Sequence, residues 1–156
     1  MDEATLQQLR ESSGLSIDGE GQFFVHGERV EHARSQLVLT KGMHRAPDGR
    51  WATRIGREWA YVQVADVARF IRCIEPMHDA AAPGLLRATL TSGEEQMVEA
   101  RNFSTGHNDA LYVSLADGET ARLSRAAQLS LSLHLAIDEA GAWIELDGER
   151  RPIPSR

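Results

Sequence analysis

Two stretches of this chain are nearly alike: IDGEGQFFVHGER at residues 17–29 and IDEAGAWIELDGER at residues 137–150. Each begins with Ile-Asp, reverses at glycine, continues through aromatic or aliphatic residues and ends in Gly-Glu-Arg. Glycine supplies the positive φ angles that a tight reversal needs. Each stretch therefore predicts a β-hairpin, and their likeness suggests that a larger unit of the fold is repeated.

The segments next to these hairpins extend the likeness. Residues 30–42 have apolar residues at helical spacing and end at Gly42, so we expect a helix there. Residues 124–135 contain two conflicting patterns, because leucines at every second position favour a strand while Ser124 and the following alanines favour a helix. Residues 27–38 align without a gap with residues 118–129, pairing Arg34 with Arg125, and this alignment favours the helix.

A Gly-turn followed by tryptophan comes after each of these segments, as DGRW at residues 48–51 and AGAW at residues 140–143. We therefore predict an α+β fold with two similar β-rich subdomains, each with one helix, that arose by internal duplication. The predicted parts are an N-terminal segment (1–14) that is helical over residues 1–12, a first repeat (15–75), a linker (76–84) rich in Ala and Pro, and a second repeat (85–156). The alternative is chance, because hairpins with a glycine turn and an aromatic residue are common.

Large apolar residues within the predicted elements are the candidates for the core. They are Trp51, Trp59, Phe70, Leu129, Leu133 and Trp143. We expect Trp51 and Trp143 to be buried at equivalent places in the two repeats.

Bulk composition excludes several classes of function. The 156 residues have a formal net charge of -6, which disfavours a general nucleic-acid partner, and they contain no apolar run long enough to span a membrane. The start is polar and acidic rather than typical of a secretory signal, and the single Cys73 cannot form an internal disulfide. These features predict a cytoplasmic protein.

Residue patterns typical of catalysis or metal binding are missing from the sequence. The six histidines and Cys73 lack the close spacing of zinc ligands, and there is no Gly-x-Ser-x-Gly elbow or phosphate-binding glycine loop. We therefore expect no metal and no cofactor, and we assign no catalytic residue.

One stretch has a charge opposite to that of the chain. Residues 41–57 contain five cations and one anion. Its arginines are Arg45, Arg50, Arg54 and Arg57, and strand alternation places Arg50 and Arg54 on one face. Arginine binds phosphate and carboxylate groups through paired, coplanar donors, so these four residues are the candidate ligand-binding site. The alternative is a solvated outer face whose charges pair locally.

The same landmarks resemble a bacterial family called domain of unknown function 1285. The stretches that resemble it are LSIDGEGQFFVHGERVEHARSQLV (15–38), DGRW (48–51), YVQVAD (61–66) and ALYVSLADGETARLSRAAQLSL (110–131). The resemblance implies two similar β-rich subdomains, each with a helix, and a role in signalling or ligand sensing. It implies no catalytic residues.

The sequence therefore predicts a non-enzymatic module that binds a small anionic ligand or a protein partner, with a part in bacterial signalling or regulation. The alternative is an enzyme whose site is assembled from dispersed residues at the interface between the two repeats. A deep pocket there with two close carboxylates, or with a histidine beside a carboxylate, would favour the enzyme.

Overall fold

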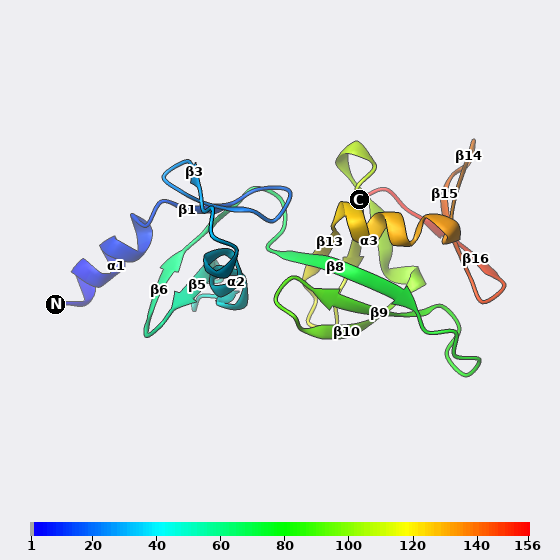
Figure 1. The fold of residues 1–156 in the computed structure, drawn as a ribbon, viewed down its shortest axis with the longest axis horizontal. Helices are drawn as coiled ribbons and strands as arrows, with labels where there is room; N and C mark the ends of the chain where they lie inside the picture. The colour runs from blue at the N-terminus through cyan, green and yellow to red at the C-terminus, as the bar shows by residue number, and fades with distance from the viewer. Residues whose placement is uncertain (1) are drawn as a thin grey trace. The chain divides into compact units, whose positions relative to one another are not determined.

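The computed structural model describes residues 2–156 and has the predicted α+β fold. Its residues form two compact units, one extending to Ala68 and the other comprising Arg69–Arg156 (Figure 1). None of the helices in the described residues is long and apolar enough to cross a membrane.

The first unit contains two helices and two small sheets. The helices are α1 (Glu3–Glu11) and α2 (Ala33–Lys41). One sheet has the order β3-β2-β1-β7 and the other the order β4-β5-β6. Their strands are β1 (Leu15–Ile17), β2 (Phe23–Val25), β3 (Glu28–Arg29), β4 (Met43–Arg45), β5 (Trp51–Ile55), β6 (Glu58–Tyr61) and β7 (Gln63–Val64). The expected helix at residues 1–12 is α1, and Met1 lies outside the described residues.

The turns that the sequence marks are stabilised by their own side chains. Asp2 begins α1 by accepting a hydrogen bond from the backbone N–H of Thr5 at 2.8 Å. Asp18 accepts hydrogen bonds from the N–H groups of Glu20 and Gln22, both at 2.9 Å, and this closes the β1–β2 reversal. Gly42 ends α2 so close to β5 that an added Cβ would lie 2.3 Å from the Arg54 carbonyl oxygen. The sequence therefore brings α2 tightly against β5.

The second unit is built on a six-stranded sheet with the order β10-β9-β8-β13-β12-β11. Helix α3 (Arg125–Ser130) packs on β8, and a three-stranded sheet β14-β15-β16 follows it (Figure 1). The strands are β8 (Arg69–Pro76), β9 (Leu85–Leu90), β10 (Glu95–Glu99), β11 (Phe103–Thr105), β12 (Leu111–Ser114), β13 (Thr120–Leu123), β14 (Leu135–Asp138), β15 (Gly141–Leu146) and β16 (Glu149–Ile153). Short 3-10 turns cover Ala100–Asn102, His107–Asp109 and Ser132–His134.

The boundary between the units falls at Ala68 and Arg69, not in the expected linker at residues 76–84. β8 pairs antiparallel with β9 and parallel with β13, so it belongs to the sheet of the second unit. Residues 76–84 connect two adjacent strands of that sheet. A run rich in alanine and proline is expected both in a loop between strands of one sheet and in a linker between two units. The sequence alone does not distinguish these two cases.

The expected core residues are mostly wrong. Phe70 is buried, but Trp51, Trp59 and Trp143 are only half-buried, so the expected burial of Trp51 and Trp143 is not found. Leu129 and Leu133 are 73% and 94% exposed. The expected helix in this region is confirmed for Arg125–Ser130, where it buries Ala127.

A 3-10 turn follows this helix, and it changes which leucines face the core. Leu131, which the pattern did not single out, is fully buried in the core of the second unit. Leu129, Leu131 and Leu133 alternate as in a strand but lie in the helix and the turn, and only Leu135 belongs to a strand, at the start of β14.

The internal duplication stays a prediction. In both units, a three-stranded antiparallel meander is followed by a helix and then by a second three-stranded meander with tryptophan in its central strand. The surrounding strands differ, because β7 extends the first meander of the first unit whereas β8, β9 and β10 extend that of the second.

A glutamine contact also occurs in each unit. The side chain of Gln36 in α2 accepts a hydrogen bond from the N–H of Phe23, and that of Gln128 in α3 accepts one from the N–H of Leu111. Phe23 is the first residue of β2 and Leu111 the first of β12. These two strands are the central strands of the meanders that precede α2 and α3.

Candidate functional site

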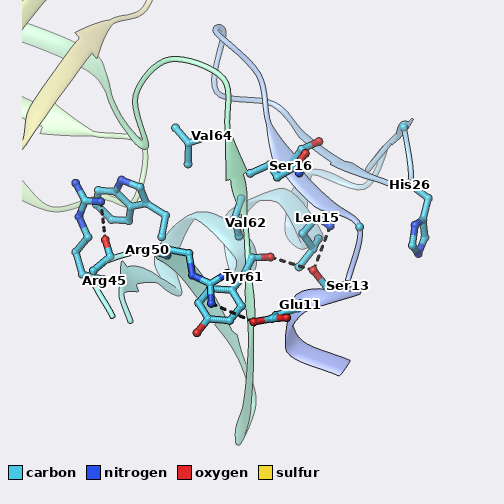
Figure 2. A pocket seen from close by; sticks show the side chains of 15 residues that line it. Glu11, Ser13, Leu15, Ser16, His26, Arg45, Arg50, Tyr61, Val62 and Val64 are labelled. Atoms are coloured by element: carbon cyan, nitrogen blue, oxygen red, sulfur yellow. Dashed lines mark hydrogen bonds and ion pairs between the residues drawn. The ribbon is translucent and has the colours of Figure 1, made fainter. Parts of the chain in front are cut away.

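A cavity of about 890 Å3 in the first unit contains two of the predicted arginines (Figure 2). The end of α1, strand β1, the β2–β3 turn, the β4–β5 turn and the end of β6 all contribute to its wall. Arg45, Arg50, Trp51 and Tyr61 line it together with Glu11 and Ser13.

Arg50 is the most strongly held side chain of this wall. Its Nε donates to Asp48 Oδ2 at 2.9 Å, and its Nη2 donates to Glu11 Oε1 at 3.2 Å. Its guanidinium also lies over the Tyr61 ring, 3.6 Å from the ring centroid. The Tyr61 hydroxyl in turn donates to Asp48 Oδ2 at 2.8 Å, so two carboxylates and one aromatic ring fix the guanidinium.

These contacts also set the protonation of the carboxylates. The hydrogen bond from Arg50, followed by that from Tyr61, holds the pKa of Asp48 below its ordinary value. The pKa of Glu11 is lowered first by its hydrogen bond from Gln7 and then by that from Arg50. The bonds to Asp48 and Glu11 raise the pKa of Arg50. At neutral pH the three groups are therefore ionised, and Arg50 faces two negative charges.

Arg45 forms a second stack of a cation on an aromatic ring. Its guanidinium lies 4.2 Å from the centroid of the Trp51 ring, and its Nη1 donates to the Gly49 carbonyl oxygen at 2.9 Å. The β4–β5 register places Arg45 directly opposite Trp51, which explains the contact. The predicted Pro-Asp-Gly turn at residues 47–49 connects these two strands and orients Asp48 toward Arg50.

The structure brings together only two of the four predicted site residues. Arg54 and Arg57 do not line the cavity, and their guanidinium groups form no ion pair or hydrogen bond within residues 2–156. Strand alternation correctly separates Arg54 from Trp51, but Arg50 lies in the turn just before β5 and follows the turn rather than the strand.

The opposite part of the wall is built from backbone and small side chains. Ser13 Oγ donates to the Tyr61 carbonyl oxygen at 2.9 Å and accepts from the N–H of Leu15 at 3.2 Å. Gly14 has a φ of +69°, and an added Cβ would lie 2.2 Å from the His26 ring, so a larger residue here would strain the backbone and displace that ring. Figure 2 shows His26 on this side, away from Arg45 and Arg50.

Sequence reasoning did not find Glu11, Ser13 or Tyr61. Glu11 is 39 residues from Arg50, and nothing in either local pattern connects them. The basic stretch and the turn signal at residues 47–49 pointed to the Arg45–Arg50 side of the site, but not to these three residues.

The second unit has a smaller and more apolar cavity of about 530 Å3 along β14, whose wall includes Leu111, Leu135, Ile137 and Trp143. The enzyme alternative would be favoured by a histidine beside a carboxylate, and one such pair is present in this unit, with His78 Nδ1 lying 3.2 Å from Asp147 Oδ1. Neither residue of this pair lines the cavity of either unit. An enzyme site at the interface of the two halves stays a prediction without assigned residues.

Among residues 2–156, no group of three His, Cys, Asp or Glu side chains is placed so that it could hold a metal ion.

No protein-family model and no curated protein matches the sequence. Two solved structures are similar to this chain. A DUF1285 family protein from Silicibacter pomeroyi DSS-3 aligns with a TM-score of 0.65 at 16% identity, over 92% of this chain and 80% of that protein. A DUF1285 family protein from Shewanella baltica OS155 aligns with a TM-score of 0.53 at 20% identity, over 76% of this chain and 89% of that protein. The resemblance expected from the sequence is confirmed at the level of the fold.

Proposed function

We propose that this chain is a regulatory binding module of the bacterial cytoplasm and that its first unit binds a small molecule with a carboxylate or phosphate group. The observation that supports the proposal is the cavity of about 890 Å3 with Arg45 and Arg50 held in its wall. Its size lies within the range of roughly 300–1,000 Å3 that is typical of ligand pockets.

The way in which the arginines are held suits an anionic group. Arg45 lies on Trp51, and Arg50 lies on Tyr61 and is bonded to Asp48, so both guanidinium groups are oriented before a ligand arrives. Fixed guanidinium groups present paired donors to a carboxylate or phosphate and lose little freedom on binding.

Glu11 is the group that an incoming anion would replace. The Glu11 and Arg50 side chains are 51% and 53% exposed, and exposed ion pairs are weak. Asp48 would remain on Arg50 and keep it in place, while the ligand takes the position of the Glu11 carboxylate.

This exchange links ligand binding to α1. Helix α1 has no buried residue. It is attached to the rest of the unit by polar contacts, among them Glu11 with Arg50, Gln7 with the Tyr61 hydroxyl, and Arg10 over the Trp59 ring. Loss of the contact from Glu11 would loosen α1, which gives the module an output that a partner can detect.

The direct test is a titration with citrate and with inorganic phosphate. In a chain with Trp59→Phe and Trp143→Phe, fluorescence reports on Trp51 in the cavity wall alone. We expect a saturable change that weakens as salt is added, because salt screens exposed charges. Arg45→Gln should weaken binding at least tenfold, whereas Arg54→Gln removes the same charge outside the cavity and should leave binding unchanged. Equal losses in the two variants, or no response to either anion, would refute the proposal.

The role of Glu11 has its own test. Glu11→Gln removes the competing carboxylate and should tighten citrate binding roughly two- to fivefold, the effect expected of an exposed ion pair. Glu3→Gln is the matched control, because Glu3 is also on α1 but pairs with Arg10. Hydrogen exchange in α1 should become faster on addition of citrate in the unmodified chain. If citrate binds but hydrogen exchange in α1 does not change, the binding proposal holds and the proposed regulation through α1 is wrong.

A further inference from the structure

Strand β14 (Leu135–Asp138) is an edge of the three-stranded sheet in the second unit. It pairs with β15 on one side, and within residues 2–156 no strand pairs with its other side. In an antiparallel pair, every second residue points its N–H and C=O away from the neighbouring strand. In Figure 1 the β14–β15 hairpin projects beyond α3, and Ile137 and Asp138 at its end are exposed within the unit.

Strand β14 has few of the features that block the addition of another strand. Its sequence LAID contains no proline, lysine or arginine, and its register with β15 has no bulge. Its one charged residue, Asp138, is the last of the strand and pairs with Arg150 of the same sheet. The other edge of the same sheet differs, because β16 contains Arg151 and Pro152. Proteins protect exposed edges with charged residues and proline, so an unprotected edge indicates a surface that is covered in use.

The side chains around this edge are unusually apolar for an exposed surface. Ile137 on β14 is 83% exposed, and Leu133 in the preceding 3-10 turn is 94% exposed. The apolar cavity of the second unit runs along the strand and is lined by Leu135, Ala136 and Ile137. A strand added to β14 would therefore cover apolar surface as well as backbone.

We propose that this edge binds β14 of a second copy of the chain, antiparallel and with a two-fold axis at Ala136. This arrangement places Leu135 opposite Ile137 of the other copy, and His134 opposite Asp138. Each contact occurs twice, as a two-fold interface requires. The strand is thus complementary to itself.

Charge determines the direction of pairing. Asp138 and Glu139 both stand at one end of the segment. Parallel pairing would set each of them against its own copy, and like charges opposite one another destabilise a pair of strands. Antiparallel pairing separates the two acidic ends. Because β14 has four residues, the interface is small and the dimer should be weak, dissociating in the micromolar range or above.

The first experiment is sedimentation of the full chain across protein concentrations from micromolar to millimolar. We expect a reversible monomer–dimer equilibrium. Ile137→Glu should raise the dissociation constant at least tenfold, whereas Ile55→Glu, the same change at an exposed isoleucine of the first unit, should not alter it. A chain that stays monomeric at the highest concentration, or an Ile137→Glu variant that dimerises as well as the unmodified chain, would overturn the proposal.

The second experiment tests the two-fold axis directly. In a Cys73→Ser background, Ala136→Cys places a thiol opposite itself across the interface, where cross-strand Cβ atoms lie roughly 4.5–5.5 Å apart and can be joined by oxidation with little movement. Ala140→Cys at the hairpin tip is the control, because the two tips would lie at opposite ends of the paired strands. We expect a disulfide-linked dimer from Ala136→Cys alone. Dimerisation without this cross-link, or equal cross-linking at both positions, would exclude β14 pairing and indicate a different surface.

Discussion

The contacts of Gln36 predict that a single glutamine on α2 stabilises the first unit. Its side chain accepts a hydrogen bond from the Phe23 N–H at 3.0 Å and donates to the carbonyl oxygens of Phe23 at 3.2 Å and Val30 at 2.7 Å. Gln36→Met keeps the length of the side chain and removes its amide group. The substitution should therefore preserve packing while these three hydrogen bonds are lost.

The expected loss of stability follows from these bonds and from burial. A hydrogen bond contributes a net of about 0.5–1.5 kcal/mol, and a buried polar group left without a partner costs more. Phe23 is fully buried, so water cannot easily replace the bond to its N–H. We expect Gln36→Met to lower the free energy of unfolding of the first unit by about 2–4 kcal/mol. For a unit of this size that corresponds to a fall in Tm of roughly 8 °C or more.

The assay follows the first unit alone. In a Trp143→Phe background, the remaining tryptophans are Trp51 and Trp59, both in the first unit, and their fluorescence can be followed during urea unfolding. Gln8→Met is the control, because Gln8 is an exposed glutamine of α1 with no side-chain hydrogen bond in the described chain. If Gln36→Met changes the unfolding free energy by less than about 0.5 kcal/mol, as expected of an ordinary surface substitution, the reasoning is wrong.

Three further predictions follow from close packing, from burial and from charge. Gly42→Ala should destabilise the first unit by about 1–3 kcal/mol in urea unfolding, because the new Cβ meets the Arg54 carbonyl, whereas without that clash alanine would stabilise it by about 0.4–1 kcal/mol. Leu131→Ala should cost about 2–5 kcal/mol and Leu133→Ala less than about 0.5 kcal/mol, measured by thermal unfolding of the second unit. Because folding lowers the pKa of Asp48, its contribution to stability is present above the ordinary value of 3.8 and is lost as the pH falls through the lowered pKa, so Asp48→Asn should reduce the acid dependence of unfolding.

The sequence predicted local structure well where one residue type determines the backbone. The glycine reversal at residues 17–23, the Pro-Asp-Gly turn at residues 47–49 and the helix ending at Gly42 are all present. The first two depend on conformations that glycine or proline favours, which are properties of the residue itself. Gly42 has an ordinary φ of -81°, and glycine is needed there because the Arg54 backbone lies so close. β13 was missed, because residues 120–123 were included in the alignment with the segment before α2 and their pairing with β8 depends on residues far away.

The candidate site was predicted only in part, and for the same reason. Charge counting identified Arg45 and Arg50 as members of a basic stretch, but the carboxylate that completes the neutralisation of Arg50 is on α1. In the folded unit, Asp48 and Glu11 both pair with Arg50, so the charge of this arginine is already neutralised. The proposed anion would therefore bind there by exchange with Glu11, which the composition of residues 41–57 did not indicate.

The glutamine contacts also show which register an internal duplication must have. The sequence alignment pairs Arg34 with Arg125, but the helices begin at Ala33 and Arg125. The structure pairs Gln36 with Gln128, since both accept from the central strand of the preceding meander. The helix starts Ala33 and Arg125 are 92 residues apart, and so are the two glutamines and the tryptophans Trp51 and Trp143. One residue is therefore inserted before the helix rather than after it. Gln128→Met should weaken the second unit through the loss of the Leu111 bond, whatever the origin of the two halves, as Gln36→Met should weaken the first.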